Sequence, residues 1–219
     1  MNLLELLNGN VDSYAVAGKV YGVVVGIVTN NQDPEKLGRV KVKYPWLSDS
    51  EESHWARLAT LMAGKDRGSF YLPEVDDEVL LAFEHGDVRF PYVLGMLWNG
   101  KDTPRYDNSD GKNDLRVITS RSGHEFIFND NDQQGKVTIH TKKNHTITLD
   151  DSAGGEKISI EDHTGGNSIV IDSNLNSIAV KSSTKLTIDS QVVEIKAGGT
   201  MKLEATGTMT IKGAMVMIN

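Results

Sequence analysis

Two groups of neighbouring carboxylates, Glu51–Glu52 and Asp76–Glu78, are the first side chains in the sequence with types and spacing suited to chemistry. Glycosidases use paired carboxylates as acid, base or nucleophile. Both groups lie in segments rich in turn formers, where acidic side chains are common because they are solvated and hydrogen-bond the turn. We therefore predict that neither group is catalytic and that the chain is not an enzyme.

Metal ligands are the second candidates, because the chain has six histidines, although it has no cysteine. Without cysteine it has no thiolate ligands, thiol nucleophiles or disulfides. His140 and His145 differ by five positions, which would place them on opposite faces of a continuous strand. Glycine pairs at 154–155, 165–166 and 198–199 are similar to a calcium-binding repeat but lack its following Gly and Asp. We predict surface histidines, glycine turns, and no metal or cofactor.

The formal net charge is −7, and it is unevenly distributed along the chain. Residues 136–219 carry nine Lys against nine Asp or Glu, so the whole acidic excess lies in residues 1–135. Nucleic-acid binding requires clustered Lys and Arg that contact phosphates. A nucleic-acid partner is therefore not predicted.

Residues 20–99 are predicted to form short strands, because they contain five runs with a period of two. Turn formers separate the runs, and five short strands in fewer than a hundred residues are typical of an OB-type barrel. Tyr44, Trp46 and Trp55 are possible stacking platforms for a sugar or nucleotide, but we expect barrel-core or subunit contacts instead. The runs are Val23/Val25/Ile27, Val40/Val42/Tyr44, Trp55/Arg57/Ala59/Leu61, Val79/Leu81/Phe83 and Val93/Gly95/Leu97.

Residues 136–219 contain an internal repeat in which a pair of apolar residues, separated by one position, recurs ten times. The step between pairs is ten or eleven residues at first and seven to nine later. The final pair is Val216/Ile218. The earlier pairs make up the predicted core: Val137, Ile139, Ile147, Leu149, Ile158, Ile160, Ile169, Ile171, Ile178, Val180, Leu186, Ile188, Val193, Ile195, Met201, Leu203, Met209 and Ile211.

A single repeat is too thin to be stable. Two buried aliphatic side chains contribute roughly 3–6 kcal/mol, whereas ordering eight residues costs about 12 kcal/mol. The strands must therefore stack, either within one chain as a solenoid or between chains, and the spacing permits both. The absence of aromatic residues after Phe128 and of a capping segment favours an intertwined trimer, in which strands of three chains would alternate on each face. Ten repeats about 4.8 Å apart would form a needle on the order of 50 Å long.

Several motifs of residues 26–99 resemble the OB domain of phage baseplate assembly protein V and of the VgrG spikes of type VI secretion systems. They are DP-x-x-LGRV at 33–40, Pro-Trp at 45–46, W-x-R-x-A at 55–59, and LPE-x-x-DEV at 72–79, followed by P-x-VLG at 91–95. In that family a trimeric β-helix follows the barrel. The resemblance therefore implies an all-β homotrimer, with an OB-fold barrel and then an intertwined, triple-stranded β-helix.

The predicted organisation has four parts. Residues 1–19 form an N-terminal segment in which Leu3, Leu4, Leu6 and Leu7 are expected to contact a hub protein. Residues 20–99 form the OB domain, residues 100–135 a linker and the lead-in to the helix, and residues 136–219 the spike. The linker is too short for the lysozyme domain of some phage spikes. Met215, Val216, Met217, Ile218 and Asn219 are expected to bind a PAAR-type tip protein.

The resemblance implies a structural function, as the spike of a contractile injection system. A homotrimeric needle would sit at the tip of the inner tube, attached through the hub, and would puncture the target envelope. MNLLELLNGN does not read as a signal peptide, so we expect synthesis in the cytoplasm, assembly into a phage tail-like particle, and release with it. The alternative is a receptor- or polysaccharide-binding adhesin on a β-helical stalk.

Overall fold

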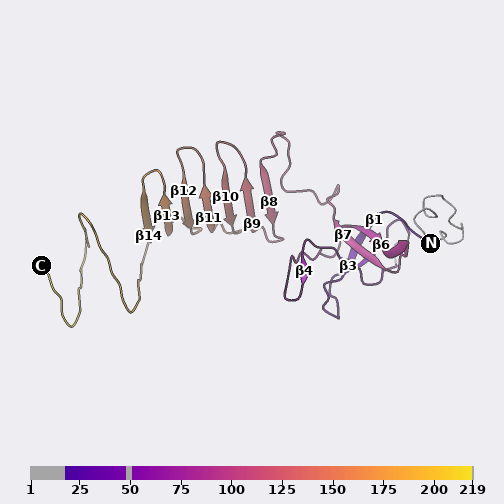
Figure 1. The fold of residues 1–219 in the computed structure, drawn as a ribbon, viewed down its shortest axis with the longest axis horizontal. Coiled ribbons are helices and arrows are strands. Elements are labelled where there is room, and N and C mark those ends of the chain that lie inside the picture. The colour runs from indigo at the N-terminus through magenta and orange to yellow at the C-terminus, as the bar shows by residue number, and fades with distance from the viewer. Residues whose placement is uncertain (1–17, 48–50, 219) are drawn as a thin grey trace, which may run out of the picture. The chain divides into compact units, whose positions relative to one another are not determined.

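A computed structural model describes residues 18–47 and 51–218. The chain divides into two compact units, here called the barrel unit, which ends at Ser109, and the sheet unit, which begins at Asp110. In both units the regular structure is almost entirely β (Figure 1). Within the described ranges, no helix is long and apolar enough to cross a membrane.

The barrel unit contains a five-stranded sheet with the order β2-β1-β6-β7-β3. All neighbouring strands in it are antiparallel except β3 and β7, which are parallel. A short hairpin, β4–β5, and one 3₁₀ turn, η1 (Glu84–Gly86), lie outside this sheet. The strands are β1 (Val24–Asn30), β2 (Lys41–Lys43), β3 (Arg57–Leu58), β4 (Ala63–Gly64), β5 (Arg67–Gly68), β6 (Glu78–Phe83) and β7 (Pro91–Met96).

Two isolated bridges close the sheet into a barrel. Val40, just before β2, pairs with Ala56, just before β3, and Lys43 pairs with Glu52. These bridges join the two edge strands, so neither edge is left open for uncontrolled pairing with other chains. The closed barrel surrounds a small core made of Val28, Val40, Val42, Tyr44, Ala56, Val79, Leu81, Phe83 and Val93.

The inward face of the strands follows the predicted alternation in β2 and β6. It differs around β3, where Ala56 is buried and Leu58 packs against the core while Leu61 is exposed. It also differs in β1. There the buried residue is Val28, and Val24 packs against the core, while Val23 and Val25 are exposed. Three consecutive valines make both faces of β1 apolar, so a period of two could not choose between them. At Gly26 a Cβ atom would lie 2.5 Å from a methyl group of Leu81, which shows how closely β1 approaches β6.

The sheet unit contains seven strands, each of which pairs with its neighbours in sequence order, β8 to β14. All six pairings are antiparallel and in register, and Figure 1 shows the strands side by side in one layer. The strands are β8 (Leu115–Thr119), β9 (Glu125–Asn129), β10 (Lys136–His140), β11 (Thr146–Asp150), β12 (Lys157–Glu161), β13 (Ser168–Asp172) and β14 (Ser177–Lys181). This sheet begins at Leu115, within the segment expected to be linker and lead-in.

Residues 182–218 follow β14 and contain no strand in this structure. Figure 1 draws them as a ribbon without arrows beyond β14. Every residue in this range is exposed. The later half of the repeat therefore has the apolar pattern of strands but forms no strand pairing with residues 18–47 and 51–218.

Candidate assembly surface

One face of the seven-stranded sheet is covered by two ladders of apolar side chains. The register stacks them because the second and fourth residues of every five-residue strand point to the same face. The first ladder is Ile118, Phe126, Ile139, Ile147, Ile160, Ile169 and Val180, and the second is Phe128, Val137, Leu149, Ile158, Ile171 and Ile178. The first ten residues of the predicted core, Val137 to Val180, all belong to these ladders.

The ladders are largely uncovered in a single chain. The exposed fraction of their aliphatic side chains extends from 39% at Ile147 to 73% at Ile178, apart from the better-covered Val137. A groove of about 710 Å³ follows the first ladder and is bounded by Leu186. A contiguous apolar surface of this extent marks an interaction site in a protein that functions in water.

The opposite face of the sheet is more polar than the ladder face, although Val117, Ile127, Val170 and Ala179 also lie on it. The register places Lys136, Asp150, Lys157 and Asp172 next to one another across β10 to β13. Hydrogen bonds from Ser152, with the positive charges of Lys136 and Lys157, hold the pKa of Asp150 below its usual value. Alternating charges favour this register, because opposite charges on neighbouring strands attract.

The in-chain pairing of β10 to β14 corrects one expectation. The first five apolar pairs were expected to alternate with strands of other chains, but here each pairs with the next pair of its own chain. The physical reason is loop length, since the four to six residues between these strands are enough to close hairpins. From Leu186 onward, the remaining predicted core residues are exposed and unpaired among the described residues.

A polar cluster joins the first three strands of the sheet. The Glu125 carboxylate is 3% exposed; it accepts a hydrogen bond from Thr119 Oγ1 at 3.1 Å and lies 2.8 Å from His140 Nε2. Sequence reasoning assigned His140 to the surface and missed this contact. A signal was present, because Glu125 begins one strand and His140 ends the next, so an antiparallel hairpin pairs them.

Three of the five candidate catalytic carboxylates have structural partners. Glu52 forms an ion pair with Lys41 at 3.1 Å, and this hydrogen bond lowers the Glu52 pKa. Asp77 accepts a hydrogen bond from the backbone N–H of Glu74 at 2.8 Å, while Glu78 accepts one from Asn99 at 3.0 Å. These contacts tie the acids to turns and strand ends, as their sequence context indicated. No group of three or more His, Cys, Asp or Glu that could hold a metal ion occurs in residues 18–47 and 51–218.

The three aromatic residues considered as stacking platforms are not equivalent. Tyr44 is 6% exposed and its ring packs edge-on against Phe83, so it belongs to the core. Trp46 is about half exposed, and Trp55 lies under the cationic groups of Arg39 and Lys41, at 5.9 and 5.7 Å from the ring centre. The three rings therefore do not form one continuous platform.

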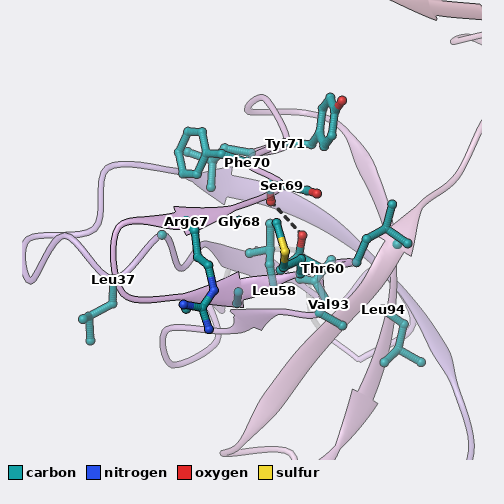
Figure 2. A pocket seen from close by; sticks show the side chains of 18 of the residues that line it. Leu37, Leu58, Thr60, Arg67, Gly68, Ser69, Phe70, Tyr71, Val93 and Leu94 are labelled. Atoms are coloured by element: carbon teal, nitrogen blue, oxygen red, sulfur yellow. Dashed lines mark hydrogen bonds between the residues drawn. The ribbon is translucent and has the colours of Figure 1, made fainter.

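The barrel unit has an apolar groove of its own, of about 1030 Å³, beside the β4–β5 hairpin. Figure 2 shows Phe70 and Tyr71 on one side of it and Leu94 on another, with the Thr60 hydroxyl donating to the Ser69 carbonyl between them. Leu61, Phe70 and Tyr71 are strongly exposed. The apolar lining and wide opening are more typical of a protein contact than of a pocket for a small polar substrate.

The two predicted terminal contacts are only partly described by the structure. Met215, Val216, Met217 and Ile218 are exposed, in keeping with a docking segment but also with the rest of residues 182–218. Asn219 and the expected hub contacts, Leu3, Leu4, Leu6 and Leu7, lie outside the described residues.

The fold and its surfaces define an all-β protein, in which a closed five-stranded barrel precedes a repetitive sheet with an uncovered apolar face. The predicted fold class is confirmed to that extent, and the barrel is confirmed as an OB domain. Residues 24–98 match the family described as the type VI secretion system/phage-baseplate injector OB domain.

Curated relatives extend the match beyond the barrel. The chain is 29% identical over 147 residues to the type VI secretion system spike protein VgrG1b of Pseudomonas aeruginosa, a match that covers 62% of this chain and 20% of VgrG1b. It is 31% identical over 136 residues to the spike protein VgrG3 of Vibrio cholerae, covering 58% of this chain and 13% of VgrG3. The chain thus spans about a fifth or less of the length of these two proteins. Over these ranges the chain is similar to the VgrG-type spike proteins, and its residues 24–98 match the baseplate-injector OB domain.

Proposed function

We propose that three copies of this chain assemble around a common axis, with the apolar faces of their sheets turned inward, to form the spike of a contractile injection system. The observation that carries this function is the pair of apolar ladders, largely uncovered in a single chain. Burying apolar surface contributes roughly 25 cal/mol per Å², so covering thirteen large side chains is a strong driving force.

The shape of the ladders supports a narrow central core. Each strand contributes only two inward side chains, such as Ile158 and Ile160 of β12. Three such faces would enclose six side chains per layer, with strands running across the axis. Consecutive layers would then be about 4.8 Å apart, the usual spacing of hydrogen-bonded strands.

Residues 182–218 would continue the spike by pairing with other copies. Their apolar pairs recur every seven or eight residues, which leaves two or three residues for a turn after a five-residue strand. Two-residue hairpins need residues that adopt positive φ, such as Gly or Asn. The first two connectors, Ser182–Thr184 and Ser190–Gln191, contain neither, so folding back on the same chain is disfavoured at these two positions, whereas the later connectors contain Gly199, Gly207 and Gly213.

The assembled needle would be longer than the repeat count alone indicated. Seven layers would come from the in-chain sheets and five from the later pairs, which gives roughly 60 Å at the usual strand spacing. Every layer would share its apolar core among three chains, so bending or separating them would break many contacts together. Stiffness of this kind is suited to puncturing an envelope, and the role requires no catalysis.

The remaining partners follow from the position of a spike in such a machine. A hub protein of the inner tube would hold the barrel units, with the N-terminal leucines as contacts, and a PAAR-type protein would cover Met215 to Asn219. The chain would be made in the cytoplasm and incorporated into the particle there.

Electron microscopy of purified particles tests this function. Antibody labelling of an epitope in the barrel unit should mark the tip of the inner tube, and particles that lack the chain should lose delivery of their contents. Specific binding of the isolated trimer on a glycan array, with unlabelled particle tips, would instead favour the adhesin.

A further inference from the structure

The two lateral edges of the sheet unit are formed by different loops. Because the strands are consecutive and antiparallel, alternate loops emerge at opposite edges. Residues 120–124, 141–145 and 162–167 connect strands at one edge, here called the basic edge. Residues 130–135, 151–156 and 173–176 connect them at the other, here called the acidic edge.

The charges of these loops are opposite in sign. The basic edge carries Arg121, Lys142 and Lys143 against the single acid Asp162, for a formal charge of +2, together with His124, His145 and His163. The acidic edge carries Asp130, Asp132, Asp151 and Glu156 with no Lys or Arg, for a formal charge of −4. Solubility alone requires polar loops at both edges, but it does not require the two edges to carry charges of opposite sign.

Part of this charge is used within the chain. Asp130 forms an ion pair with Arg116 at 3.0 Å, and Asp162 holds its own turn by accepting hydrogen bonds from Thr164 and Asn167. Lys142 and Lys143 in the loop between β10 and β11 are exposed, as are Asp132 and Asp151 on the other edge. These four side chains therefore remain accessible to a second molecule.

Threefold symmetry brings the two edges together. In a closed ring of three copies every contact is heterologous, so the basic edge of one copy meets the acidic edge of the next. An isologous, side-by-side dimer would instead place like edges against each other. Like charges at such a contact would oppose that dimer.

The positions of the loops along the threefold axis also bring opposite charges close together. If this axis runs in the direction in which the strands of each sheet are stacked, equivalent strands of the three copies lie at the same position along it. The β10–β11 loop of one copy then lies between the β9–β10 and β11–β12 loops of its neighbour, about 4.8 Å from the level of each. Lys142 and Lys143 would therefore sit between the loops that carry Asp132 and Asp151.

We infer that the charge difference between the two edges selects a second copy of this chain as lateral partner and closes the corners of the ring, an inference that rests on the proposed threefold assembly. Lys142 and Lys143 of each copy contact the carboxylates of Asp132 and Asp151 in the next. At physiological ionic strength the Debye length is about 8 Å, so charges in contact at a corner still attract.

Charge reversal and its restoration test this inference in the full-length chain. One variant carries Lys142→Glu and Lys143→Glu, a second carries Asp132→Lys and Asp151→Lys, and a third combines all four. Lys65→Glu with Lys101→Glu, both exposed in the barrel unit, is the control with the same change in net charge as the first variant. Sedimentation on dilution at 50 mM and 500 mM salt measures the trimer dissociation constant.

The first two variants should each raise that constant by about tenfold or more at 50 mM salt, less at 500 mM. The combined variant should recover to within about threefold of the unchanged chain, and the control should match the unchanged chain. Equal constants for all variants, or no recovery on combination, would overturn the corner contact while leaving the trimer intact. If the unchanged chain is not trimeric, the proposed function fails with the inference.

Zero-length carbodiimide coupling supplies a measurement that does not depend on variants folding. In trimers assembled from equal amounts of isotopically light and heavy copies, about half of the peptides that join Lys142 or Lys143 to Asp132 or Asp151 should contain one light and one heavy partner. Couplings confined to one chain, or only between like edges, would contradict the proposed contact.

Discussion

The carboxylate of Asp33 accepts hydrogen bonds from Nε and Nη2 of Arg39, both at 2.8 Å. The same carboxylate accepts the backbone N–H groups of Glu35 and Leu37, each at 3.0 Å. Asp33 thereby organises the loop between β1 and β2, and the hydrogen bonds from Arg39 hold its pKa far below the usual range. The DP-x-x-LGR motif is thus a structural clamp of the barrel.

Replacing Asp33 with Asn should lower the thermal stability of the barrel unit, because an amide cannot accept all of these hydrogen bonds and leaves Arg39 without its main counter-charge. The thermal midpoint, followed by tryptophan fluorescence, measures the effect, because all three tryptophans lie in the barrel unit. Glu35→Gln is the matched control, since Glu35 is exposed and contacts Arg39 only through Nη2, at 3.1 Å. Equal midpoints for the two variants would show that Asp33 does not hold this loop.

The β12–β13 turn should lose stability in acid. Hydrogen bonds, chiefly from Thr164 and then Asn167, lower the pKa of Asp162 from 3.8 to about 2. Because the folded pKa is the lower one, the stabilisation is fully present above the unfolded value and is lost as the pH falls from about 4 to 2. Amide exchange of the turn at pH 5 and pH 2.5 measures this, and Asp162→Asn should remove the Asp162 contribution. A turn equally protected at both pH values would refute the assignment.

Ile171→Asp should prevent assembly of the trimer. Ile171 lies in the second ladder, and threefold symmetry would bring three carboxylates into one apolar layer. A buried, unpaired charge costs several kcal/mol, so three would cost about 10 kcal/mol. No trimer should be detectable by light scattering at micromolar concentration. Ala179→Asp, on the polar face of β14, should assemble normally, and a trimeric Ile171→Asp protein would show that the ladder does not face the axis.

Removal of Met215 to Asn219 should abolish binding of a PAAR-type tip protein without dissolving the trimer, because nine of the ten apolar pairs remain. Co-purification of the partner together with the mass of the spike measures both effects. A matched variant with Met215→Ser alone should weaken binding less. Unchanged co-purification after the deletion would place the docking site elsewhere.

The sequence was sufficient to predict which residues are buried where the apolar pattern was compatible with only one inward face. Val40 and Val42 alternate with the charged residues Arg39, Lys41 and Lys43, and the structure buries both valines. The apolar pairs from Val137 to Val180 likewise lie on one face, as their spacing predicted. In β1 the consecutive apolar residues from Val23 to Val25 left the inward face undetermined, and only packing against Leu81 decided it.

Other features depend on contacts that a linear pattern does not show. Phe126 and Phe128 extend the ladders to residues before 136, where the β-helix was predicted to begin. They were not assigned to the repeat because they are aromatic, whereas the repeat consists of aliphatic pairs. Pairing within the chain, as between Ile147 and Ile160, follows from loop length and not from apolar spacing. The Glu125 and His140 contact required the hairpin register.

The mass of the chain in solution tests the central claim most directly. If the aliphatic ladders are covered by two further copies, sedimentation equilibrium or light scattering at micromolar concentration should give three times 24.0 kDa. A folded, monodisperse species of one or two chains at micromolar concentration would contradict the threefold spike.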